Sequence, residues 1–83
     1  MKNPLEKIQE LIPILPEKDI KIVNKYLDKR DFQSIIEIVE SDIYKAERSN
    51  NVNSNYYMQL IELRDNLSIY LACTDIYYNN YDY

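Results

Sequence analysis

The fold is decided by one uninterrupted stretch, residues 55–78, which reads NYYMQLIELRDNLSIYLACTDIYY. It contains neither glycine nor proline, the two residues that most strongly interrupt helices. Apolar and aromatic side chains, with one threonine, recur at alternating spacings of four and three: Tyr56, Leu60, Leu63, Leu67, Tyr70, Thr74 and Tyr77. This spacing predicts a long helix that buries one stripe against neighbouring helices, as in a coiled coil.

Two shorter helices are predicted near the start of the chain. The first covers about residues 4–12, with Asn3 as its cap and Pro4 in its first position, where both residue types are favoured. It should end before Pro13, because the residue before a proline avoids the helical conformation. The second covers about residues 16–29, and the proline and acidic residues of its first turn favour a helix start there.

A third helix is predicted over residues 32–48, with Asp31 as its cap. Its apolar residues fall on one broad face: Phe32, Ile35, Ile36, Val39, Ile43 and Ala46. The polar run 49–54 can join it to the long helix in an antiparallel pair, and residues 79–83 are predicted to form a short tyrosine-rich tail. The predicted fold class is all-α: a small helical bundle, one domain covering the whole chain, with two long antiparallel helices and two shorter ones.

The composition argues against most catalytic and metal chemistry. The chain of 83 residues has no histidine, no glycine and one cysteine. The usual general base, a glycine-rich phosphate loop, an intrachain disulfide and a zinc site of nitrogen and sulfur ligands are therefore all missing. We expect no enzyme activity, no cofactor, no metal ion and no small-molecule substrate.

The remaining reactive groups are expected to be ordinary core or surface residues. Cys73 has neither a cationic neighbour nor a position at a helix N-terminus, the features that activate a thiol, so we expect a small packed side chain. Two pairs of carboxylates, Glu37 with Glu40 and Asp19 with Glu17, stand among lysines or on polar helix faces. We expect both pairs to be solvated, with no burial that would raise a pKa.

The charge is mildly acidic and uneven along the chain. The net charge is -4, with seven basic and six acidic residues in 1–31 but three basic and eight acidic residues in 32–83. No basic stripe of the kind found in nucleic-acid-binding proteins is present, so nucleic-acid binding is unlikely. Four lysines share one face of the second helix: Lys18, Lys21, Lys25 and Lys29. They form either a contact strip for phosphate or an acidic partner, or a solvated helix face, and we favour the solvated face.

The hydropathy pattern bears on the location of the protein. No window reaches the roughly 20 apolar residues of a membrane-spanning helix, and the first residues do not resemble a signal peptide. We therefore expect no membrane partner, and a location in the cytoplasm or in an intracellular or viral particle.

The second half of the long helix carries more apolar residues than one buried stripe requires. Between Asn66 and Tyr81 the only charged residue is Asp75. A second apolar set points away from the stripe: Met58, Ile69, Ala72, Cys73 and Ile76. Either the first helix and the Ile14–Leu15 connector cover this second face, or another polypeptide does.

The function predicted from this pattern is protein interaction without catalysis. The candidate interface to a protein partner, or to a second copy, is Ile69, Ala72, Cys73, Ile76, Tyr77, Tyr81 and Tyr83. Tyrosine is enriched at such interfaces, although the tyrosines also fit the codon usage of an AT-rich genome. The short length and the AT-rich character of the sequence are consistent with a small accessory protein of a phage or mobile element.

An alternative function is a regulator that occupies the basic nucleic-acid-binding surface of a partner protein. Four acidic residues of the third helix would then carry the contact: Glu37, Glu40, Asp42 and Glu47. The two functions differ in salt dependence, because an apolar interface holds at high salt and a charged one releases.

Overall fold

The long helix α4 forms the spine of the structure. The computed structural model describes residues 3–81, and the side chains of residues 3–73. It contains helices α1 (Pro4–Leu11), α2 (Glu17–Asp28), α3 (Phe32–Arg48) and α4 (Asn55–Tyr81), with the 3₁₀ turn η1 (Ile12–Ile14) between the first two. No strand occurs among the described residues, so the predicted all-α class is confirmed.

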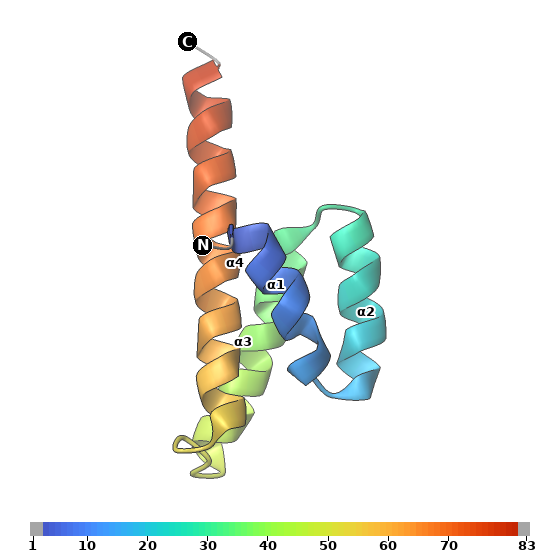
Figure 1. Ribbon diagram of the computed structural model, residues 1–83, viewed down its shortest axis with the longest axis vertical. Helices are drawn as coiled ribbons and strands as arrows, with labels where there is room; N and C mark the ends of the chain where they lie inside the picture. Colours follow the sequence, from blue (N-terminus) through green and yellow to red (C-terminus); the bar gives the residue numbers. More distant parts are fainter. Residues whose placement is uncertain (1–2, 82–83) are drawn as a thin grey trace.

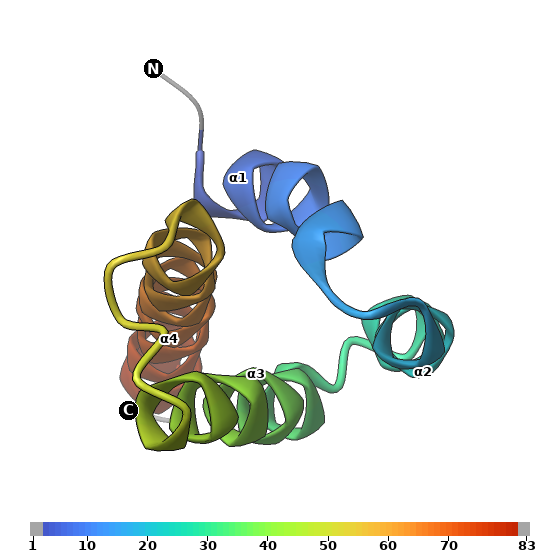
Figure 2. The same ribbon diagram turned by 90° about the horizontal axis from the view of Figure 1, so that it is seen from below.

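The four helices stand at the corners of a four-sided bundle. Helices α3 and α4 run antiparallel and side by side (Figure 1). Helix α1 packs against α4, and α2 packs against α3, as the view along the bundle shows (Figure 2). The turn η1 contacts α1, α2 and α4 and so closes the fourth side. The predicted arrangement, two long antiparallel helices with two shorter ones packed on them, is confirmed.

Helices α1 and α3 begin at the caps that the sequence predicted, and α4 begins at a further cap, Ser54. The Asn3 side chain accepts a hydrogen bond of 2.9 Å from the backbone N–H of Glu6. The Asp31 side chain accepts a hydrogen bond of 3.3 Å from the backbone N–H of Ser34 and one of 2.7 Å from the Ser34 hydroxyl. At the start of α4, Ser54 Oγ accepts a hydrogen bond of 3.1 Å from the backbone N–H of Tyr57. Each bond satisfies a backbone donor that the first turn of a helix leaves free.

Two helix ends adopt a left-handed backbone conformation without glycine. After α2, Arg30 has φ 60°, and after α3, Asn50 has φ 59°. The next N–H in each case reaches back to the last turn: Asp31 donates to the Tyr26 carbonyl at 2.9 Å, and Asn51 donates to the Ala46 carbonyl at 2.8 Å. This is the Schellman arrangement, in which glycine is the favoured residue at the left-handed position.

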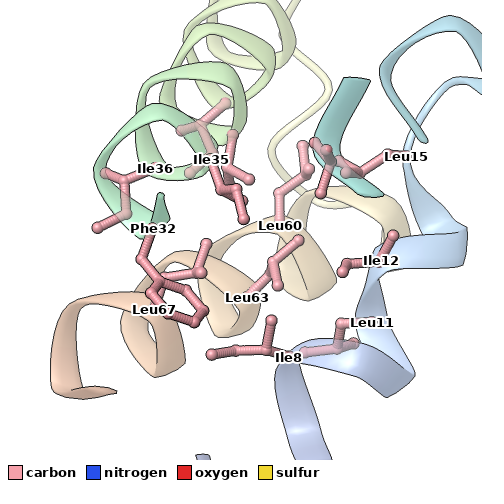
Figure 3. Close-up of a cluster of buried hydrophobic side chains, with 13 residues drawn as sticks. Ile8, Leu11, Ile12, Leu15, Phe32, Ile35, Ile36, Leu60, Leu63 and Leu67 are labelled. Carbon is pink, nitrogen blue, oxygen red and sulfur yellow. The ribbon is translucent and has the colours of Figure 1, made fainter. Parts of the chain in front are cut away.

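The core lies between α1, α3 and α4 and is closed at one end by η1 and Leu15 (Figure 3). Its buried side chains are Ile8, Leu11, Ile12, Leu15, Val23, Phe32, Ile35, Ile36, Val39, Ile43, Leu60, Leu63 and Leu67. The stripe predicted on α4 supplies the three leucines, each without solvent exposure. Full burial of such a side chain stabilises a fold by about 1.5–3 kcal/mol. Helix α2 contributes one fully buried residue, Val23.

Helix α4 is longer than anything that packs against it. The ring of Tyr70 meets that of Phe32, the first residue of α3, with centroids 4.8 Å apart. Because α3 runs antiparallel and begins there, it offers no surface further along α4, and the end of α4 stands clear of the other helices (Figure 1). The prediction of a tail from residue 79 was wrong as to its start, since α4 continues through Tyr81. The sequence there contains no glycine or proline to end a helix.

Candidate functional site

The second apolar face of α4 is exposed. Met58 retains 62% of its accessible surface and Ile69 retains 50%, and both Ala72 and Cys73 are exposed as well. Helix α1 therefore does not cover these four residues. The side chains of four further residues of the predicted interface lie outside the described residues: Ile76, Tyr77, Tyr81 and Tyr83.

Helix α1 instead covers another side of α4. Lys7 Nζ lies 3.0 Å from Glu62 Oε1, in an ion pair at the surface, and the pKa of Lys7 is raised by its hydrogen bond to Glu62. Ile61 and Leu71 are half-buried against the core. Of the two explanations for the second apolar face, cover by the first helix is therefore excluded for its four described members, which are all exposed.

The position of Cys73 corrects the expectation of a packed thiol. Its side chain is exposed and forms no disulfide. Cys73 lies just beyond Tyr70, where α3 no longer runs beside α4, so the bundle supplies nothing to bury it.

The four lysines predicted on one face of the second helix are all exposed, as expected for a solvated helix face; three lie in α2, and Lys29 is at its C-terminal cap. Tyr26, on the flank of α2, is half-buried beside Ile38 and Ser34 of α3. Helix α2 therefore presents its half-buried flank to α3, and not to α1.

A carboxyl pair that the sequence prediction did not include lies between α2 and α3, while Glu37, Glu40 and Glu17 of the predicted pairs are exposed. Asp42 of α3 is only 6% exposed, and its Oδ2 has no hydrogen-bond partner among the described residues. Burial is the largest cause that raises the pKa of Asp42, to about 6. The next cause is Asp19 of α2, because protonated Asp42 can donate a hydrogen bond to the Asp19 carboxylate and the two negative charges repel.

Three helices surround this carboxyl pair. Burial, followed by the charges of Asp42 and Asp19, raises the pKa of Tyr56 on α4. Lys45 and Lys18 act in the opposite sense and lower the pKa of Asp42. Neither lysine forms an ion pair with the two carboxylates, however, since the ion pairs among the described residues lie elsewhere. The pair, with Asp42 buried and Asp19 half-buried, is therefore a negative site without a direct counter-ion.

Asp42 and Lys45 line two hollows. The first, which we call the α2–α3 hollow, has a volume of about 300 Å³ and is lined by Asp19, Tyr26, Ser34, Glu37, Ile38, Ser41, Asp42 and Lys45. The second, of about 280 Å³, lies towards α4 and is lined by Pro16, Lys18, Asp42, Lys45, Ala46, Ser49, Asn51 and Tyr56. Carboxylates, hydroxyls and an aromatic ring together are suited to bind a cationic group.

One sequence signal could have identified the buried carboxylate. Asp42 follows Ile35 by seven positions, about two helical turns, and Ile38 stands between them. This spacing places Asp42 at the edge of the apolar face of α3. An acidic residue at the edge of an apolar face is either exposed or buried in surroundings that raise its pKa. The sequence contains nothing that identifies Asp19 as the neighbour of Asp42.

The acidic surface considered for a regulator is only partly present. Glu37, Glu40 and Glu47 are exposed on α3, but Asp42 is buried and does not form one exposed surface with them. Glu47 also accepts a hydrogen bond of 2.8 Å from the hydroxyl of Tyr57, which ties the ends of α3 and α4 together.

Comparison with protein-family models, with curated proteins and with solved structures found no match to this chain. Among the described residues, no group of three or more acidic, cysteine or histidine side chains is arranged to hold a metal ion. In the same part of the chain, no helix is long and apolar enough to cross a membrane.

Proposed function

We propose that this chain is a non-enzymatic interaction protein, which docks through the exposed apolar face of α4. The observation that carries the proposal is Ile69, half exposed on a helix whose opposite stripe already fills the core. An apolar patch on a small protein commonly marks an interaction site, because its exposure to water is unfavourable. An accessory role in a phage or mobile element is consistent with such a protein.

The spacing of the face favours a second copy of the chain as the occupant. In the sequence, Ile69 and Ile76 stand three residues outside the adjacent small residues Ala72 and Cys73. This order of large and small residues is the same in both directions. Two such helices paired antiparallel about a two-fold axis would set isoleucine against isoleucine and let the small residues approach closely.

The absence of charge on this part of the helix supports the same occupant. Between residues 66 and 81 the only charged residue is Asp75. In a contact about a two-fold axis, a residue near the axis lies close to the same residue of the second copy. A charge there would therefore face an identical charge and be repelled. An uncharged, apolar surface avoids this repulsion.

The experiment is sedimentation velocity over protein concentrations from about 5 to 500 µM. We expect the wild type to form a dimer that persists in 1 M salt, since apolar contacts are not screened by salt. Ile69→Asp should remain helical by circular dichroism and become monomeric. Ser68→Asp is the matched control, because it places the same charge on the neighbouring exposed position of α4 and should leave the dimer intact.

A wild type that stays monomeric at every concentration would exclude self-association. Docking on a different protein would then be tested by capture from the native source with wild type and Ile69→Asp. Equal recovery of the same partner by both proteins would refute the use of this face.

A further inference from the structure

We propose that the α2–α3 hollow is a binding site for a basic side chain of a partner polypeptide, an arginine guanidinium that bridges Asp19 and Asp42. The inference goes beyond the proposed function. It concerns α2 and α3 and uses no residue of the exposed face of α4.

The strongest observation is the state of Asp42. It is more than nine-tenths buried, its Oδ2 has no hydrogen-bond partner in the part of the chain that the structure describes, and its side chain lines the hollow. A buried carboxylate oxygen without a hydrogen-bond donor destabilises a fold, so such groups are normally paired or bind a ligand. The neighbouring carboxylate of Asp19 can accept a hydrogen bond from protonated Asp42, but above about pH 6, where Asp42 ionises, the two negative charges together favour a bound cation.

The lining of the hollow matches a guanidinium group in particular. A planar guanidinium donates hydrogen bonds in several directions at once, so it can reach both carboxylates, whereas an ammonium is a compact point charge. The half-buried ring of Tyr26 offers an aromatic surface of the kind on which guanidinium groups stack. The hydroxyls of Ser34 and Ser41 supply further acceptors.

The size of the hollow favours one side chain over a larger ligand. Its volume of about 300 Å³ lies at the lower limit of pockets that hold small molecules. A cation attached to a polypeptide would fill the hollow and leave the rest of the partner to contact exposed residues of α3, such as Glu37, which also lines the hollow.

The charged or titratable groups that face the pair come from three helices. They are Lys18 on α2 and Glu37 and Lys45 on α3, together with the titratable but neutral Tyr56 on α4. The two lysines are exposed and make no ion pair with the carboxylates. They could compete with an incoming guanidinium, so Lys45→Gln should strengthen its binding.

The test is a titration of ¹⁵N-labelled protein with acetyl-argininamide, followed by amide chemical shifts at pH 7.5. We expect saturable changes at Ser34, Ile38, Asp42 and Lys45, with a dissociation constant of roughly millimolar order for this minimal probe. Acetyl-citrullinamide, which has the same shape without the charge, should produce no saturable change.

Two variants identify the group responsible. Asp42→Asn should weaken binding of the arginine probe at least about tenfold, while Glu40→Gln, a charge loss at an exposed position of the same helix, should leave it unchanged. Wild-type binding should also weaken between pH 7.5 and pH 5, because the carboxyl whose pKa is about 6 then becomes protonated.

Three outcomes would overturn the proposal. These are no saturable shift on α2 and α3, equal shifts with the citrulline probe, or unchanged affinity in Asp42→Asn. Saturable shifts of the same amides with calcium or magnesium ions and none with the arginine probe would assign the pair to a metal ion instead. Loss of the dimer in Ile69→Asp has no bearing on these results, so the two proposals can fail separately.

Discussion

Helix α3 packs against two neighbours, and the two contacts differ in character. Towards α4 it meets a dry stripe, in which Leu60, Leu63 and Leu67 are fully buried. Towards α2 it meets one fully buried apolar residue, a carboxyl pair and a hollow. The difference distinguishes a contact that stabilises the fold from one whose polar groups the fold does not require. The α3–α4 contact stabilises the bundle, while the α2–α3 contact contains a buried carboxyl, Asp42, beside the half-buried Asp19, and folding alone does not explain this pair.

The difference should also appear in the dynamics of the bundle. Helix α2 has one fully buried apolar residue, Val23, and Ile20, Tyr26 and Leu27 are only partly buried against the core. Local opening of a protein begins where buried apolar contacts are fewest. A helix that opens easily beside a hollow can adjust to a bound group, which is consistent with a binding site between α2 and α3.

The largest effect is expected from breaking the dry contact. Leu67→Ala should lower the free energy of unfolding by about 2–4 kcal/mol, because it removes a fully buried side chain and leaves a cavity. Ile69→Ala, two residues away and half exposed, should cost less than about 1 kcal/mol. Urea denaturation of both variants, at a concentration where the protein is monomeric, measures the contrast. Equal losses would mean that the two faces of α4 do not differ as described.

The polar contact should respond in the opposite direction. Asp42→Asn removes the cost of ionising a buried carboxyl, so it should raise the free energy of unfolding at pH 7.5 by up to about 3 kcal/mol. This gain is an upper limit, because the new amide must find its own hydrogen bonds in the same place.

The pH dependence follows from the direction of the shift. Asp42 has a pKa of 3.8 in the unfolded chain and about 6 in the folded protein. The folded state therefore holds the proton more tightly, and this stabilising contribution is complete below about pH 3.8 and lost as the pH rises through about 6. The advantage of Asp42→Asn over wild type should grow between pH 4 and pH 7. An advantage that is constant over this range would show that Asp42 titrates normally.

The same contrast explains what could be predicted from the sequence. Periodicity and caps are local signals, and they were sufficient for the helices, their antiparallel order and the core leucines of α4. The pairing of Asp42 with Asp19 depends on how α2 docks on α3, and no local pattern specifies that geometry. The exposure of Ile69 and Cys73 has a similar cause, because it depends on where α3 begins relative to α4, which only the assembled bundle shows.

The smallest effects are expected at the two corners that join these contacts. Arg30 leads from α2 to α3, Asn50 leads from α3 to α4, and both have left-handed backbone. This conformation costs an ordinary residue such as arginine about 1–2 kcal/mol, but asparagine tolerates it well. Glycine removes the cost in the folded state, and its greater freedom in the unfolded chain offsets about 0.5–1 kcal/mol of the gain.

Arg30→Gly should therefore stabilise the protein by about 0.5–1 kcal/mol, while Asn50→Gly should change its stability by only a few tenths. Thermal or urea unfolding of the two variants, measured beside wild type, gives the comparison. The matched pair is informative because the two corners share the same Schellman hydrogen bonds and differ in the residue that carries them. A loss of stability in Arg30→Gly would mean that contacts of the arginine side chain stabilise the protein by more than its left-handed backbone destabilises it. The α2–α3 corner would then be stabilised by side-chain contacts and not by its turn geometry.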